Sequence, residues 1–197
     1  MGQLVEAHGF NAKSAGACLA MFSVAQATAR VATGSISEMA LTWNARMLGL
    51  GYYHHVVPRA FFLVVAAVFG VAAHSVLAVA TSRGIFVVGV VLSGTAFGMV
   101  WPLMVLIVGE VFGTANHGAN YLFYDGFTSA IGTVLISKFI TQEVYENHID
   151  PDDQEMGNFA CYGSGCFQAS HIITVCLCLT CLVTGLGMVY TTRTKNS

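Results

Sequence analysis

The stretch Gly94–Phe127, GTAFGMVWPLMVLIVGEVFGTANHGANYLFYDGF, contains two apolar segments separated by a short turn rich in Gly, Asn and His. The first segment carries Gly94 and Gly98 in the GxxxG spacing that lets two membrane helices approach backbone to backbone. The second segment carries Asp125 in an otherwise uncharged run. Because a carboxylate is unfavourable in lipid, Asp125 is expected to face protein or a water-filled cavity. Together these features predict a polytopic membrane protein with a solute site.

The composition of the whole chain points the same way. Of 197 residues, 55% are hydrophobic and only 9% are charged, whereas soluble domains carry roughly a quarter charged residues. The formal net charge of −2 and the absence of a basic cluster argue against nucleic acid as a partner. The chain has no Gly-rich phosphate loop, no HExxH and no G-x-S-x-G motif. We therefore expect a lipid-embedded protein that is not an enzyme and has no cofactor or metal.

The lengths of the apolar runs predict the fold class. A helix needs about 20 apolar residues to cross the hydrocarbon core. By this criterion the chain is an all-α, polytopic membrane helix bundle with five spans. The predicted spans are about 15–37, 60–81, 85–108, 119–140 and 168–190.

Basic residues in the short loops predict the orientation. The loop 39–59 and the tail 191–197 both carry Lys or Arg and lie on one side of a five-span chain, so we assign that side to the cytoplasm. The segment 1–14 and the acidic loop 141–167 are then extracytoplasmic. The result is an integral, multi-pass membrane protein, with no preference between the plasma membrane and an endomembrane.

Two cysteines lie in the second of these extracytoplasmic segments. Cys161 and Cys166 stand in a polar CYGSGC sequence. A structural zinc site needs four ligands, and only two are nearby. A local disulfide in an oxidising compartment is the favoured interpretation.

Polar residues gather on particular spans. Gln26 and Arg30 share a helical face of the first span, and Tyr121 and Asp125 share a face of the fourth. With Trp101 of the third span, they are predicted to line a solute cavity. The alternative for Arg30 is to reach the lipid headgroups, and for Trp101 and Tyr121 an equal alternative is to anchor the helices at the membrane interface. Arg30 either binds an anionic solute or pairs with Asp125; pairing is the favoured role of Asp125, with proton coupling as the alternative.

The second and fifth spans are more uniformly apolar and are expected to shield the others from lipid. Their histidines, His74 and His171, are interpreted as packing residues whose polar atoms are satisfied by partners.

Five spans with an external amino terminus suggest a further helix before residue 1. With that helix added, the chain resembles the C-terminal half of a major facilitator superfamily transporter, more narrowly the nodulin-like branch related to monocarboxylate-type facilitators. The likeness rests on Phe22–Glu38 (FSVAQATARVATGSISE), on Gly94–Gly126 and on the CYGSGC loop. It implies alternating access by two six-helix halves, so the missing N-terminal half is an expected partner, in cis or in trans.

Gly34 and Glu38 match the front of the facilitator loop motif, G-x-x-x-[DE], but Met39 follows where the family has a basic residue. A carboxylate is favoured near the amino end of a helix by the helix dipole. The resemblance and this effect together predict that Gly34 and Glu38 form a conformational latch against the amino end of the fourth span.

Two other classes of function compete with transport. A non-transporting, truncated or split protein would associate with partner membrane helices through the face that carries Gly94 and Gly98. A small oligomeric channel would need polar helix faces repeated around a pore.

Overall fold

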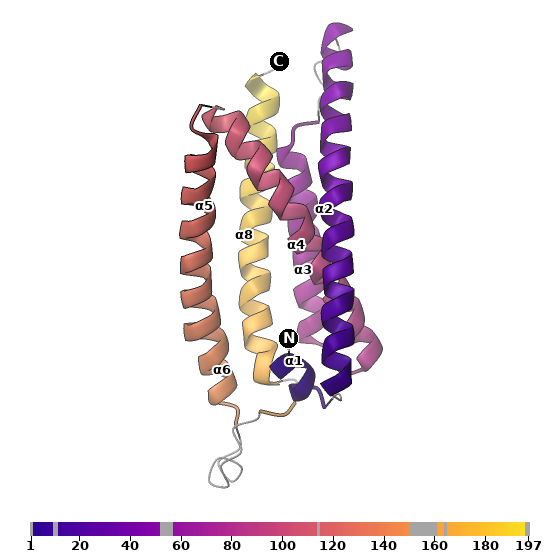
Figure 1. The fold of residues 1–197 in the computed structure, drawn as a ribbon, viewed down its shortest axis with the longest axis vertical. Coiled ribbons are helices and arrows are strands. Elements are labelled where there is room, and N and C mark those ends of the chain that lie inside the picture. Colours follow the sequence, from indigo (N-terminus) through magenta and orange to yellow (C-terminus); the bar gives the residue numbers. More distant parts are fainter. Residues whose placement is uncertain are drawn as a thin grey trace.

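The computed structural model describes residues 2–9, 12–51, 57–113, 115–149, 161–163 and 165–195, and every regular element in these ranges is helical (Figure 1). The prediction of an all-α helix bundle is confirmed. The elements are α1 (Gly2–Ala7), α2 (Ala12–Gly49), α3 (Ala60–Ala78), α4 (Arg83–Phe112), α5 (His117–Gly132), the π-helix η2 (Thr133–Gln142), α6 (Glu143–Glu146) and α8 (Gly165–Lys195).

Four helices in the described part of the chain are long and apolar enough to cross a membrane: α2 from Ser14, α3, α4, and α8 as far as Thr192. Many of their large apolar side chains face outward, among them Val31, Phe97 and Val183. Contiguous apolar surface of this kind needs a partner or lipid to cover it. The chain therefore has the surface of a membrane-embedded helix bundle.

The predicted span 119–140 is helical throughout but is not one uniform helix. α5 ends at Gly132, and the next ten residues continue as the π-helix η2. None of the described α5 side chains is buried, so tertiary packing contributes little to its stability. Gly126, Thr128 and Gly132 are weak helix formers within α5 itself. Neither packing nor intrinsic propensity therefore stabilises α5 strongly.

The prediction that residues 39–59 form a loop is wrong for the first half of this range, because α2 continues to Gly49. Neither Gly nor Pro interrupts the sequence between Glu38 and Gly49, so no residue there stops the helix. The Asn44 side chain then fixes the return of the chain: its amide donates to the Val57 carbonyl oxygen (2.7 Å), and its Oδ1 accepts from the Val57 amide (2.8 Å). Residues 52–56 lie outside the described part.

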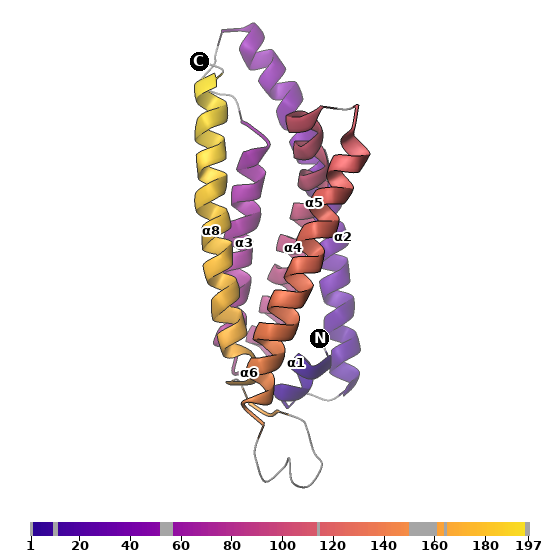
Figure 2. The ribbon, with the colours of Figure 1, turned by 90° about the vertical axis from the view of Figure 1, so that its left-hand side faces the viewer.

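The helices pack as a chain of neighbours. α2 lies along α4, α4 lies along α3, and α3 lies along α8 (Figure 2). α5 has more limited contacts, with α4 and η2. The chain's amino end lies at one end of the bundle, and the carboxyl ends of α2 and α8 lie at the other (Figure 1). The predicted topology requires this arrangement, since it places the loop after α2 and the tail on one side.

α2 and α4 come into backbone contact at the two glycines of the GxxxG pair. A Cβ added to Gly94 would lie 2.6 Å from the carbonyl oxygen of Phe22, and one added to Gly98 would come even closer to the carbonyl oxygen of Gln26. Because both obstacles are backbone atoms, no side-chain rotation can relieve the overlap. Glycine is therefore required at both positions for α2 and α4 to lie this close.

A cluster of buried residues around a disulfide packs at the end of the bundle that holds α1. Cys161 and Cys166 form a disulfide, and both are buried with Ala7 and Phe167. The Gly163 amide donates to the Ala7 carbonyl oxygen (2.7 Å). These contacts tie α1 to the segment before α8, so the two stretches predicted to be extracytoplasmic meet at one end. Residues 150–160 of the predicted 141–167 loop lie outside the described part.

Replacing Gly98 by alanine should separate α2 from α4. We expect Gly98→Ala to lower stability by about 1–3 kcal/mol, the usual range for overpacking a tight contact. Thermal unfolding of the purified protein in detergent measures the change. The matched control is Gly187→Ala in α8, where an added Cβ meets nothing within 4 Å. Equal stability of the Gly98→Ala variant and the wild type would contradict the assigned contact.

Candidate functional site

A buried arginine joins three helices at the end of the bundle where α2 finishes. Arg59, just before α3, is only 7% exposed; its Nη2 lies 2.6 Å from Oε1 of Glu38 on α2. Its Nε lies 2.9 Å from Oε1 of Glu110 on α4. The Nε–H is not aligned for a hydrogen bond, so this second contact is an ion pair only. Arg59 is therefore the central charge of a Glu38–Arg59–Glu110 cluster.

The three members of this cluster differ in exposure. The side chains of Glu38 and Glu110 are 59% and 47% exposed, so each carboxylate keeps much of its hydration, whereas Arg59 does not. A buried charge without a counterion is strongly unfavourable, but an exposed one is not. Arg59 therefore depends on the two glutamates more than they depend on it, and either glutamate can be released into water at modest cost.

The predicted latch partner of Glu38 is corrected by this geometry. Glu38 was expected to face the amino end of the fourth span, but its carboxylate pairs with Arg59 instead, and α2 makes no extended contact with α5. Gly34 stands one turn before Glu38, and a Cβ there would meet nothing within 4 Å. Its carbonyl oxygen accepts a hydrogen bond from Ser37 Oγ (2.9 Å). No close contact in the structure requires glycine at position 34.

The sequence interpretation missed Arg59 and Glu110 as site residues. Arg59 was counted only as a basic loop residue, and Glu110 received no role. A signal was available, because Glu110 is an acidic residue at the end of an apolar run and Arg59 directly precedes another. Charges in such positions need a partner.

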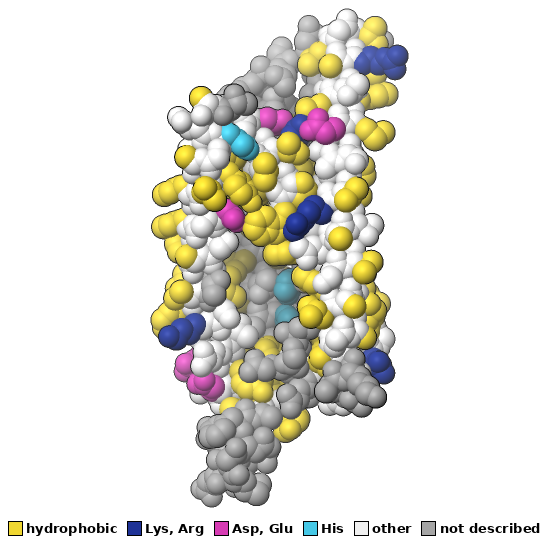
Figure 3. All heavy atoms as spheres, in the orientation of Figure 1, with side chains coloured by type: hydrophobic (Ala, Val, Ile, Leu, Met, Phe, Trp, Pro, Cys, Tyr) yellow, Lys and Arg dark blue, Asp and Glu magenta, His cyan; other side chains and the backbone are white. Residues whose placement is uncertain are grey.

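The predicted cavity residues lie around a separate, open depression. Arg30 is exposed on α2, and its guanidinium lies 5.8 Å from the ring centroid of Trp101 on α4. Tyr121 and Asp125 stand one turn apart on α5, both half-buried. Tyr121 lies within electrostatic range of both Arg30 and Asp125. Figure 3 shows basic and acidic side chains on the two walls of the depression between α2 and α5, with apolar side chains between them.

The favoured pairing of Arg30 with Asp125 is not formed. Both ion pairs in the described part of the chain belong to Arg59. The Asp125 carboxylate instead accepts a long hydrogen bond from Ser129 Oγ (3.5 Å) on its own helix. The two residues remain apart because α5 is not packed against α2. The guanidinium and the carboxylate thus face a common space without neutralising each other directly.

Gln26, the fifth predicted cavity residue, is half-buried one turn before Arg30 on α2. Its backbone carbonyl faces Gly98. Gln26 therefore lies at the α2–α4 contact that supports the Arg30 wall of the depression.

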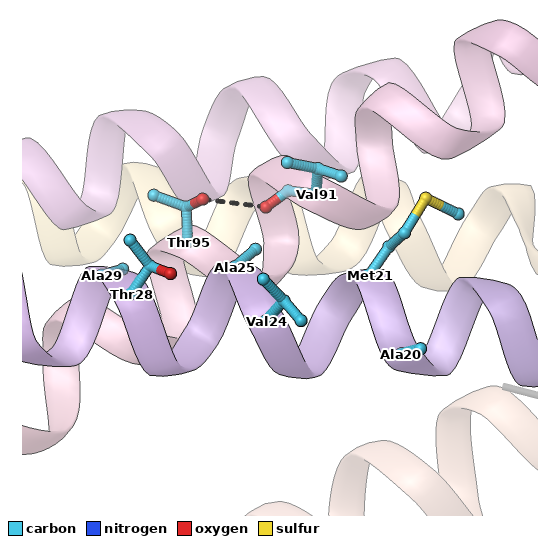
Figure 4. Close-up of a pocket in the computed structure, with 8 residues that line it drawn as sticks. All are labelled: Ala20, Met21, Val24, Ala25, Thr28, Ala29, Val91 and Thr95. Atoms are coloured by element: carbon cyan, nitrogen blue, oxygen red, sulfur yellow. Dashed lines mark hydrogen bonds between the residues drawn. The ribbon is translucent and has the colours of Figure 1, made fainter.

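A groove between α2 and α4 is chemically unsuited to a polar solute. It encloses about 550 Å³ and is lined mainly by apolar residues, including Ala20, Val24 and Val91 (Figure 4). Its polar lining residues are Thr28 and Thr95, and the Thr95 hydroxyl donates to the Val91 carbonyl oxygen (2.9 Å). No charged residue lines it. The depression with Arg30 and Asp125 is therefore the better candidate for a solute site.

No protein-family model, no curated protein and no solved structure matches the chain. The interpretation of both clusters accordingly rests on their own chemistry.

The dependence of Arg59 on two acids is testable by a double-mutant cycle. Glu38→Gln or Glu110→Gln alone should cost about 1 kcal/mol or less, because the other carboxylate still neutralises Arg59. The double variant should cost more than the sum of the two, since it leaves the buried guanidinium without a counterion. Thermal unfolding in detergent gives all the values.

The control for this cycle is Arg46→Gln, which removes an exposed arginine near the same end of α2 and should be close to neutral. Strict additivity of the two glutamate substitutions would show that Arg59 does not couple them.

Proposed function

We propose that this chain is the C-terminal part of a facilitator-type secondary transporter of the nodulin-like branch, and that it moves a small solute across a membrane by alternating access. The observation that carries the proposal is the group Arg30, Trp101, Tyr121 and Asp125, which comes from three helices and surrounds an uncovered depression. Ionisable residues within apolar helices are costly to keep and usually serve a solute or ion pathway.

The chemistry of the depression favours an organic anion. The Arg30 guanidinium has no carboxylate within 4.0 Å in the described part of the chain, and its planar fork matches a solute carboxylate in bidentate geometry. The Trp101 ring lies within cation–π range of it. On the opposite wall, the Tyr121 hydroxyl and the Asp125 carboxylate offer a second point of attachment. A small carboxylate with a further hydrogen-bonding group would engage both walls.

The Glu38–Arg59–Glu110 cluster supports the conformational part of the proposal. Alternating access needs contacts that hold one state and are released in another. Two half-exposed carboxylates on one buried arginine meet this requirement, because each carboxylate can regain water when its helix moves. Glu38 remains the proposed latch residue, with Arg59 as its partner.

The competing proposal of a partner-binding protein receives no support from the surface on which it was based. Gly94 and Gly98 pack against the backbone of α2 in the same chain. That face is therefore already occupied, and a partner helix cannot use it without displacing α2.

Uptake of small carboxylates by cells expressing the native gene product tests the proposal. A charge-assisted hydrogen bond contributes about 1.5–3 kcal/mol, so Arg30→Gln should weaken solute binding roughly 10- to 100-fold. Asp125→Asn should lower uptake as well. Surface expression, measured in parallel, should stay at the wild-type level for both.

The matched control is Arg83→Gln, which removes an exposed arginine at the start of α4 and should leave uptake unchanged. Unchanged uptake in both the Arg30 and the Asp125 variants would show that the depression is not the solute site. If the wild type instead carries neutral solutes and no carboxylates, transport stands but the anion assignment fails.

A further inference from the structure

Two histidines on sequence-distant helices form a direct hydrogen bond. His74 lies on α3 and His171 on α8, and their Nδ1 atoms are 3.2 Å apart. The ring centroids are 5.4 Å apart, with an angle of 39° between the planes. Both residues are half-buried in a helix pair that packs along its length. They were expected to be satisfied packing residues, and the structure makes each the hydrogen-bond partner of the other.

The chemistry of this contact limits how many protons the pair can bind. A hydrogen bond between two Nδ1 atoms needs a proton on one atom and a lone pair on the other. A neutral pair meets this condition, and so does a pair with one extra proton. A second extra proton would place an N–H on each facing atom and two positive charges side by side, which is strongly repulsive away from bulk water.

The charged neighbours that act on His171 among the described residues add to this repulsion. The charged groups that act on His171 are His74 and His8 of α1, all of the same sign when protonated. The Nε2 atom of His171 is buried and has no hydrogen-bond partner in the described part of the chain.

The elements packed against the pair carry charged residues of their own. Those described are Arg83 and Glu110 on α4, Lys138 on η2, and Glu143 and Glu146 on α6, but the charged groups that act most on His171 are the two other histidines.

Two groups near the pair make contacts of their own. The Cys178 thiol of α8 packs against Gly70, one turn before His74 on α3. The His8 Nδ1 bonds to the Leu4 carbonyl oxygen (2.8 Å). The described residues contain no group of three or more His, Cys, Asp and Glu side chains placed to hold a metal ion. A proton is therefore the ligand that fits the pair.

The pair also lies where protons can reach it. Both side chains are partly exposed. His74 is near the carboxyl end of α3, and His171 is near the amino end of α8. This is the end of the bundle that holds α1 and the disulfide, which the predicted topology places outside the cytoplasm.

We propose that His74 and His171 form a proton-binding site that fastens α3 to α8 while the pair holds at most one extra proton and releases this contact when both rings are charged. The site makes the bundle sensitive to acidification from the end predicted to be extracytoplasmic. It is independent of the transport proposal, because it requires only the two helices and their histidines.

The experiment is a series of melting temperatures for the purified full chain in detergent between pH 8 and pH 5. The unfolded chain charges both rings freely, whereas the folded pair does not, so the unfolded state binds more protons at low pH and stability falls as the pH falls. The test variants are His74→Asn and His171→Asn. An asparagine amide occupies roughly the place of Nδ1 and keeps a neutral hydrogen bond, but it takes no proton.

We expect the melting temperature of the wild type to be about 2–4 °C lower at pH 5 than at pH 8. Each Asn variant should lose more than half of this drop. The control His148→Gln removes an exposed histidine from the same end of the bundle and should keep the wild-type drop. An unchanged drop in both Asn variants would overturn the proposal.

A measurement on the wild type alone covers the case in which neither variant folds. Nitrogen-15 NMR of labelled histidines follows each imidazole across the same pH range. The proposal requires His74 and His171 to titrate as a coupled pair in two separated steps. Two independent titrations of ordinary shape would overturn it.

Discussion

The backbone contact between α2 and α4 at Gly94 and Gly98 sets the register of the whole bundle. The two helices run in the same direction. When one residue of α2 lies beside one of α4, residues the same number of turns further along each helix therefore also lie side by side. Arg30 follows Gln26 by about one turn, as Trp101 follows Gly98, and the two side chains meet. Glu38 lies as far beyond Gln26 as Glu110 lies beyond Gly98, and both reach the same arginine. One small-residue contact thus positions both candidate functional clusters.

The two walls of the depression differ in how tightly their helices are packed. The α2–α4 wall is fixed by atoms that cannot rotate away. The α5 wall has no buried side chain among its described residues and continues into a π-helix. Arg30 thus projects from a firmly packed helix pair, whereas Asp125 lies on a helix with few tertiary contacts. This difference explains why Arg30 and Asp125 stay separate in this conformation.

Polar groups serve as the specific links between helices in an otherwise apolar interface. Arg59 joins α2, α3 and α4 through two carboxylates, and His74 joins α3 to α8 through His171. Apolar packing alone discriminates poorly between rotations of one helix against another, since lipid is as apolar as the side chains it replaces. A hydrogen bond or ion pair adds that discrimination, and its strength depends on the charge and hydration of its members.

The sequence by itself determined the helical class, the approximate limits of α3, α4 and α8, and the existence of a solitary charge on several of the long apolar helices. Hydropathy and residue spacing are local properties, so they can be read from the sequence without knowledge of the fold. The pairing of Glu38 with Arg59 and the meeting of His74 with His171 were decided only by the tertiary structure. Each depends on which face of a helix turns toward which neighbour and at what height, and those are set by contacts between residues far apart in the chain.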